Sequence, residues 1–137
     1  METGGCLCGK IRYNFDREKI VSAGHCHCND SQKITGSGKA TIVFVPTENL
    51  EINDKYKIYS IIGTDGTNVH RGFCPDCGSP IISYVTEQPN LRFIKAGSLD
   101  DSTWVKAESS FWSTSACEWD PVDINFCLLY TSPSPRD

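Results

Sequence analysis

The sequence of 137 residues lacks several features that mark whole classes of protein. No apolar run approaches the roughly 18 residues that span a membrane, and the first ten residues, METGGCLCGK, lack the apolar region of a signal peptide. Basic residues are not in excess, because the sequence has 13 lysines and arginines but 17 acidic residues, which gives a net charge of −4. Nucleic-acid-binding domains usually carry a basic patch. We therefore expect no membrane and no nucleic acid as partner, and a cytoplasmic location.

Internal repeats and long amphipathic helices are also absent from the sequence. Short runs rich in β-branched or alternating apolar residues occur instead, which is typical of strands. These runs cover residues 10–15, 40–45, 56–62, 80–85 and 91–97. One short helical piece is expected near residues 30–34, and GTDGT at 63–67 is typical of a hairpin turn. The pattern predicts a mainly β protein with one domain.

The last eleven residues, CLLYTSPSPRD, differ in character from the rest of the chain. They show no strand alternation and no helical period, and they resemble the in-frame translation of a transposase-type sequencing adapter. We expect residues 1–126 to form the domain and 127–137 to be a non-native tail, so Cys127 is not counted as a ligand. A natural disordered tail is the alternative.

Eight cysteines are many for a chain of this length. In a reducing compartment they are expected to be thiols or metal ligands rather than disulfides. Six of them fall into three close pairs, Cys6 and Cys8, Cys26 and Cys28, and Cys74 and Cys77.

The first and third pairs lie in glycine-containing segments, GGCLCG and CPDCG, that predict tight turns. Two such turns can bring Cys6, Cys8, Cys74 and Cys77 together around one tetrahedral zinc ion. The metal would close a long loop and so stabilise a small domain. Two unrelated cysteine pairs are the alternative, although a thioredoxin-like redox pair would need a βαβ context that this sequence does not show.

The second pair reads Cys26-x-Cys28-x-x-Ser31. In an extended segment both thiols point to one face and could hold one metal. A third ligand at position 31 would leave one position open, as in catalytic zinc sites, but neutral serine is a poor zinc ligand. Alternatively, the two thiols are simply buried apolar groups. For His25, His27 and His70, a hydrogen-bonded histidine that binds no metal is the expected state. The three histidines and Asp30 are reserve ligands if the backbone departs from regular β geometry.

Five segments, in this order, resemble the glutathione-dependent formaldehyde-activating enzyme family, whose name is also joined to the centromere protein V domain. They are GGCLCGKIRY, CHCNDSQKITGSG, RGFCPDCGSPI, KAGSLDD and FWSTSACEW. The resemblance implies an Mss4-like fold of coiled antiparallel sheets. It also implies a structural zinc on Cys6, Cys8, Cys74 and Cys77, and a catalytic zinc on Cys26, Cys28 and position 31. The family's named activity is a carbon–sulfur lyase reaction that joins formaldehyde to glutathione.

Two positions depart from the family pattern. Ser31 stands where the third catalytic cysteine is expected, and Ser110 stands where many members carry histidine. Two origins of Ser31 are compatible with the sequence: an evolutionary substitution and an error in sequence assembly. Two functions follow: a zinc-dependent carbon–sulfur lyase or synthase acting on glutathione and a small aldehyde, or an interaction scaffold whose second zinc site is lost.

Three basic residues are candidates to bind a peptide carboxylate, with solvated surface charge as the alternative for each. They are Arg71, Lys95 and Lys106. A methionine sulfoxide reductase on the same fold lacks support, because Cys117 has no partnering motif. Unpaired edge strands make a homodimer compatible with this fold class.

Overall fold

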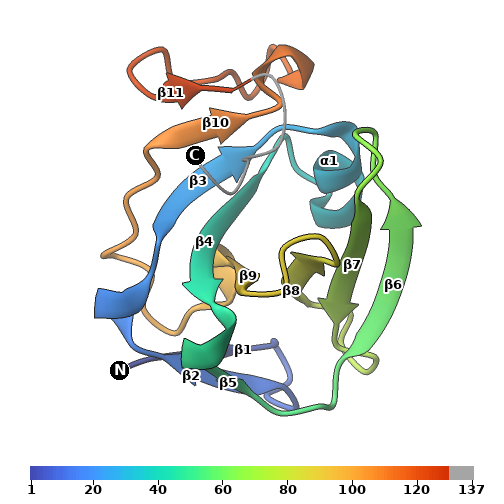
Figure 1. Ribbon diagram of the computed structural model, residues 1–137, viewed down its shortest axis with the longest axis vertical. Helices are drawn as coiled ribbons and strands as arrows, with labels where there is room; N and C mark the ends of the chain where they lie inside the picture. The colour runs from blue at the N-terminus through green and yellow to red at the C-terminus, as the bar shows by residue number, and fades with distance from the viewer. Residues whose placement is uncertain (130–137) are drawn as a thin grey trace.

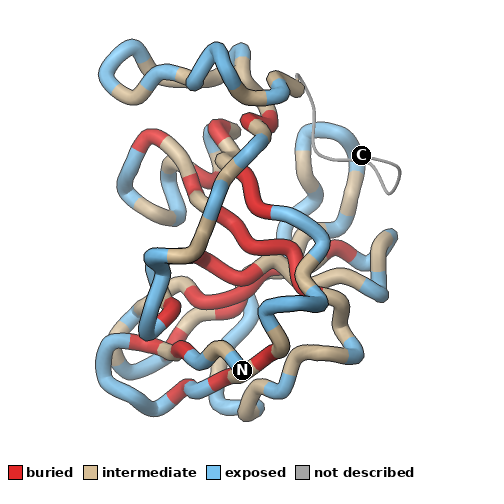
Figure 2. Tube along the Cα trace, turned by 90° about the vertical axis from the view of Figure 1, so that its left-hand side faces the viewer, coloured by how far each residue is buried: buried red, intermediate tan, exposed pale blue. Residues whose placement is uncertain are grey.

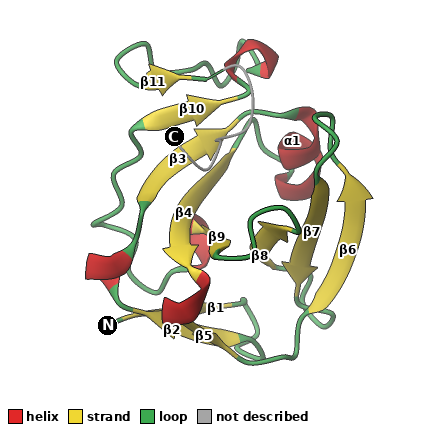
Figure 3. Cartoon of the chain, viewed as in Figure 1, coloured by secondary structure: helices red, strands yellow, loops and turns green. Residues whose placement is uncertain are grey.

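Two β-sheets organise the chain in the computed structural model, which describes residues 1–129 (Figure 1). The smaller sheet is antiparallel, in the order β1-β2-β5. Its strands are β1 (Glu2–Gly5), β2 (Arg12–Phe15) and β5 (Leu50–Ile52). Figure 3 shows that strands dominate and that helices are short. The mainly β fold class predicted from the sequence is confirmed.

The larger sheet has eight strands in the order β11-β10-β3-β4-β9-β8-β7-β6. They are β3 (Ser22–Cys26), β4 (Ala40–Pro46), β6 (Lys57–Ile62), β7 (Asn68–Phe73), β8 (Pro80–Val85), β9 (Leu91–Lys95), β10 (Ser109–Phe111) and β11 (Cys127–Leu128). Neighbours are antiparallel except at β10, which runs parallel to both β3 and β11. The sheet curves, so that β6 and β7 lie across from β3 and β4 (Figure 1).

The helical segments are short. The helix α1 (Asn29–Thr35) agrees with the helical piece expected near residues 30–34, and it ends at Gly36, whose φ of 71° is left-handed. Four 3-10 turns complete the set, at Arg17–Lys19, Thr47–Asn49, Ala96–Ser98 and Ser113–Ser115. Of the helices within residues 1–129, none has the length and apolar character to cross a membrane.

Alternate residues of the large sheet divide between two environments. Val43 and Ile94 pack on one face in the main core, together with Tyr13 and Phe15 of the small sheet. Figure 2 shows buried segments crossing the middle of the molecule. Burying each such aliphatic side chain contributes about 1.5–3 kcal/mol, so this face holds the two sheets together. The opposite face carries the residues that line the cavity described below.

Strand β6 confirms the strand predicted over residues 56–62, although all six of its residues are exposed. The reason is its position, because β6 is the last strand of the large sheet. An exposed edge strand can pair with another chain. A homodimer nevertheless stays a prediction.

The C-terminal segment forms a strand where none was expected. Cys127–Leu128 pairs with β10, and the backbone N–H of Leu129 donates to the carbonyl of Ser110 at 2.8 Å. Residues 130–137 lie outside the described residues. The division at residue 126 and the non-native origin of the tail therefore stay predictions.

Candidate functional site

Two turns bring four cysteines together, which we call the four-cysteine group. Cys6 and Cys8 lie between β1 and β2, and Cys74 and Cys77 lie between β7 and β8. Their sulfur atoms all lie within 4.8 Å of one another. The Cys6–Cys8 and Cys8–Cys74 sulfur distances are 3.6 and 3.7 Å. A tetrahedron with zinc–sulfur bonds of about 2.3 Å has edges of about 3.8 Å. The four-cysteine group could therefore hold a metal ion of the size of zinc.

The two turns share one construction. Gly9 and Gly78, with φ of 83° and 78°, turn the chain back at the end of each. The amide of Ile11 lies 3.2 Å from the sulfur of Cys6, and the amide of Cys77 lies 3.5 Å from the sulfur of Cys74. Such N–H···S contacts stabilise thiolates, so the backbone favours the ligand form of the sulfurs.

The thiols of the four-cysteine group influence one another strongly. Hydrogen bonds from Ser79 lower the pKa of Cys77 to about 5. The backbone at Lys10 lowers the pKa of Cys8, but burial and the neighbouring thiols outweigh it and raise that pKa to about 12. Four thiolates this close repel one another, and a metal cation is what allows all of them to ionise together.

The second cysteine pair lies at the junction of β3 and α1. Cys26 ends the strand, Cys28 caps the helix, and Ser31 is 5% exposed in its first turn. The sulfur of Cys28 accepts the Ser31 amide at 3.3 Å and lies 3.2 Å from the Ser31 hydroxyl. The Cys26 thiol, and then Ser31, lower the pKa of Cys28 to about 5. The Cys28 sulfur and burial raise the pKa of Cys26, so Cys28 is the thiol of the pair that ionises more readily.

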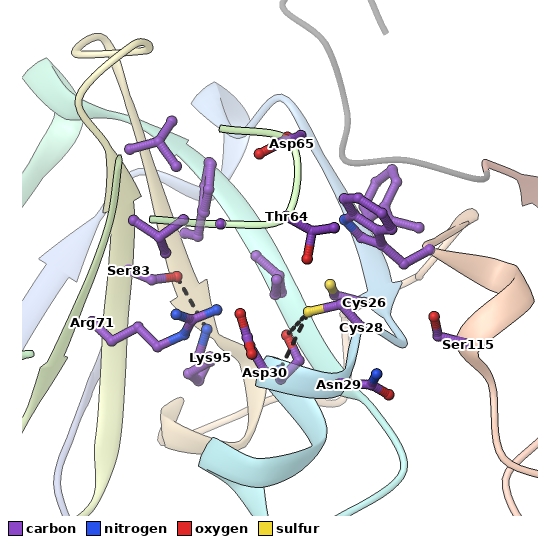
Figure 4. A pocket seen from close by; sticks show the side chains of 18 of the residues that line it. Cys26, Cys28, Asn29, Asp30, Thr64, Asp65, Arg71, Ser83, Lys95 and Ser115 are labelled. Atoms are coloured by element: carbon purple, nitrogen blue, oxygen red, sulfur yellow. Dashed lines mark hydrogen bonds between the residues drawn. The ribbon is translucent and has the colours of Figure 1, made fainter. Parts of the chain in front are cut away.

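Both thiols open into a cavity of about 230 Å³ on the concave face of the large sheet (Figure 4). Its walls are mostly apolar. Strand residues with the same orientation supply them, namely Ile42, Phe44, Val69, Val85, Phe93 and Phe111. Trp112 also lines the cavity and has a φ of 54°, unique among the non-glycine residues of the described chain. Such a conformation costs roughly 1–3 kcal/mol and persists where the surroundings enforce it.

Two basic residues line the same cavity. Lys95, at the end of β9, is 9% exposed, and its ammonium donates to the Ser83 hydroxyl at 3.1 Å. Burial, and then the charge of Arg71 on β7, lower the pKa of Lys95 to about 8. Figure 4 shows Arg71 and Lys95 together, across from Cys26 and Cys28.

The comparisons with known proteins bear on these clusters. Residues 1–115 match the sequence profile of a family described as "Glutathione-dependent formaldehyde-activating enzyme". The chain belongs to this family. The resemblance carried by the cysteine motifs is thereby confirmed.

Among solved structures, this member of the glutathione-dependent formaldehyde-activating enzyme family is similar to the crystal structure of a Rhodobacter sphaeroides protein. The TM-score is 0.56 and the identity 17%, over 72% of this chain and 87% of the other. At that identity the likeness concerns the fold alone. No curated protein matches the chain in sequence.

The reserve ligands do not complete the second cluster of this family member. Within residues 1–129, the four-cysteine group alone gathers three or more ligand-type side chains. Nδ1 of His25 lies 2.9 Å from the Thr41 hydroxyl. Asp30 lines the cavity, and His27 is fully buried with neither ring nitrogen hydrogen-bonded. The hydrogen-bonded state that the sequence analysis predicts for His27 is therefore wrong.

The second departure from the family pattern lies away from the cavity. Ser110 pairs in register with His25 and is fully buried, with no hydrogen-bond partner for its hydroxyl among the described residues. It does not line the cavity, whereas its neighbours Phe111 and Trp112 do. Lys106 is exposed and also lies outside the cavity lining.

Sequence reasoning missed the cavity walls. Ser83, Phe93 and Lys95 point to one face because alternate residues of a strand share a face. The signal was present in the alternation of β8 and β9. The sequence does not indicate which face of the curved sheet remains uncovered and forms the cavity.

Proposed function

We propose that the protein is a zinc-dependent carbon–sulfur lyase that makes and breaks the bond between glutathione and formaldehyde. One observation carries the proposal: the thiols of Cys26 and Cys28 open into a cavity, whereas the sulfurs of the four-cysteine group face one another. The first arrangement suits chemistry and the second suits stability. The cytoplasm, where glutathione is reduced, is the proposed location.

The metal assignment follows from the donor sets. Cys6, Cys8, Cys74 and Cys77 would hold a structural zinc, because their sulfur spacing matches a tetrahedral site. Cys26 and Cys28 would hold the second, with Ser31 at the third position. When bound there, zinc supplies a Lewis acid that keeps a substrate thiol in its thiolate form.

The residues of the chain contribute position and a dry environment. The aromatic walls, Phe44, Phe93, Phe111 and Trp112, exclude water around the reacting thiol. In the addition, the thiol releases its proton, and its sulfur forms a bond to the carbonyl carbon. The π electrons move to the oxygen, which takes up the proton that the thiol released. The addition in solution is already fast, so holding thiol and aldehyde together is the main gain.

A second candidate function rests on Ser31. Its side chain is buried against Cys28 and offers a neutral hydroxyl where the family pattern places a cysteine. A protein that keeps the four-cysteine group and binds no second metal would act as an interaction scaffold. The two candidates differ in a measurable quantity, the zinc content.

The test combines zinc analysis with a rate measurement on the full chain. We expect two zinc ions per chain, and an exchange rate between glutathione and its formaldehyde adduct, measured by NMR, at least ten times the spontaneous rate. Replacing Cys26 and Cys28 by serine should remove one zinc and the acceleration, whereas Cys127→Ser should change neither. One zinc per chain with no acceleration favours the scaffold.

A further inference from the structure

Lys95 differs from the other lysines of residues 1–129. Among these, Lys39 is half-buried and forms an ion pair with Asp120, and all the others except Lys95 are exposed. Lys95 is 9% exposed, and it lines the cavity into which the two thiols of the second cysteine pair open. Lysine is rarely buried in proteins, and buried lysines are known for nucleophilic chemistry. The mechanism proposed above leaves this side chain without a role.

The amine of Lys95 has a defined position in the cavity. Its Nζ donates to the hydroxyl of Ser83 at 3.1 Å. Ser83 lies on β8 and Lys95 on β9, and these two strands are hydrogen-bonded neighbours in the large sheet. Figure 4 shows Lys95 beside Ser83 and Arg71, across the cavity from the two cysteine thiols. The rigid sheet therefore presents this nitrogen to the same space as the thiols.

The surroundings of Lys95 favour its neutral amine. Burial, and then the charge of Arg71, lower the pKa of Lys95 to about 8, and the two cysteine thiols act in the opposite direction but are outweighed. Two further acidic residues, Asp30 and Asp65, also line the cavity. At pH 7 about one in ten amines with this pKa is neutral, compared with roughly one in three thousand for an ordinary lysine. The neutral amine is the form that attacks carbonyl groups.

We propose that Lys95 holds the aldehyde covalently, as an imine on its side-chain nitrogen. The nitrogen forms a bond to the carbonyl carbon, and one of its protons moves to the oxygen, which gives a carbinolamine. The carbon–oxygen bond then breaks, the hydroxyl leaves as water with a second proton from the nitrogen, and a carbon–nitrogen double bond forms. Nothing is oxidised or reduced. Water reverses the same steps and releases the aldehyde inside the cavity.

The cavity suits a small aldehyde. Its volume of about 230 Å³ lies below the roughly 300–1,000 Å³ that is usual for sites of drug-sized ligands. Apolar walls such as Phe44 and Phe93 limit access of water, and the condensation, which releases water, is favoured where water is scarce. This inference rests on the proposed function for the identity of the aldehyde. It adds the place where the aldehyde is held while the thiol binds.

The test traps the imine on the zinc-loaded full chain. Substoichiometric, isotope-labelled formaldehyde is added at pH 7 with cyanoborohydride, which reduces an imine to a stable methylamine and does not reduce thiol adducts. Peptide mass spectrometry then separates Lys95 from the N-terminal amine and from the other lysines. We expect Lys95 to carry roughly ten times more label, or more, than the exposed Lys106. Equal or weaker labelling of Lys95 overturns the proposal.

A variant connects the imine with the reaction. Lys95→Arg keeps a positive charge but removes the nucleophile, so it should lose the label and slow the exchange of the glutathione–formaldehyde adduct about tenfold or more. The matched control, Lys106→Arg, should behave like the wild type. Unchanged exchange in a folded Lys95→Arg also overturns the proposal. If this variant misfolds by circular dichroism, the labelling of the wild type decides.

The two measurements separate this inference from the proposed function. Selective labelling of Lys95 without accelerated exchange keeps the aldehyde site and rejects the proposed lyase. Accelerated exchange without selective labelling keeps the lyase and rejects the aldehyde site.

Discussion

The two cysteine clusters of this protein differ in where their thiols point, although both consist of cysteines. In the four-cysteine group, two turns from distant parts of the chain aim their sulfurs at one point. In the second cluster, Cys26 and Cys28 come from one junction, and the remaining side faces a cavity. If the proposed function is correct, completeness of the ligand set, rather than the residue type, separates a stabilising site from a reactive one.

Cys74→Ser tests the stabilising half of this comparison and should have the largest effect. Structural zinc contributes about 10 kcal/mol or more in small domains, which is comparable with the total stability of most domains. We expect the variant to lose a zinc ion and its cooperative thermal transition in circular dichroism. Cys28→Ser should keep that transition within a few degrees. Equal melting temperatures for Cys74→Ser and the wild type would contradict the assignment.

Lys95→Met tests the charge beside the second cluster. Burial lowers the pKa of Lys95 from 10.5 to about 8, which corresponds to about 3 kcal/mol. Between pH 8 and 10.5 Lys95 is protonated in the unfolded chain but largely neutral in the folded chain. The contribution of this residue to the free energy of unfolding therefore rises with pH between these two values. Below pH 8 the residue is charged in both states, and its full cost to the stability of the folded chain is present. Lys95→Met should therefore unfold at higher urea at pH 7, by up to about 3 kcal/mol, and the gain should shrink as pH rises to 9.5.

The matched control for this prediction is Lys106→Met, which removes an exposed lysine. It should leave the free energy of unfolding unchanged at both pH values. A gain for Lys95→Met that does not vary with pH would mean that packing, not charge, is responsible.

Ser31→Cys should make the second cluster resemble the first. A third thiolate replaces a neutral hydroxyl 3.2 Å from the Cys28 sulfur, so the second zinc should be held at least ten times more tightly. Competition with a chromophoric chelator measures this directly. If the wild type and Ser31→Cys release zinc identically, position 31 does not contact the metal.

Lys10→Ala should have the smallest effect. The Lys10–Asp76 pair joins the two turns of the four-cysteine group at 3.1 Å, but its side chains are 36% and 61% exposed. Exposed pairs contribute less than about 1 kcal/mol and are screened by salt. We expect a small loss of stability in urea unfolding that vanishes in 1 M sodium chloride. A larger, salt-independent loss would show that the ion pair, and not only the sulfur cluster, holds the turns.

Local signals explain what the sequence could predict. Glycines beside Cys6, Cys8 and Cys77 marked the turns, alternation marked β2 and β6, and a β-branched run marked β4. These features depend on residues that are close together in the sequence, so they can be predicted from the local sequence pattern.

Tertiary arrangement explains what was missed. Strand β10 has three residues and joins β3 in parallel, which no local pattern encodes. Arg71 and Lys95 meet because β7, β8 and β9 are adjacent in the sheet, and register across strands is set by the whole fold. The exposure of β6 likewise follows from its place at the edge.

The position of β10 also has a consequence for how the molecule is made. Strands β4 to β9 are synthesised between β3 and its parallel neighbour, so β10 leaves the ribosome late. The six paired cysteines all precede β10 in the chain, so they emerge before Phe111 and Trp112, which wall the cavity. Ions from the surrounding medium can thus reach Cys26 and Cys28 in the nascent chain before this wall is in place.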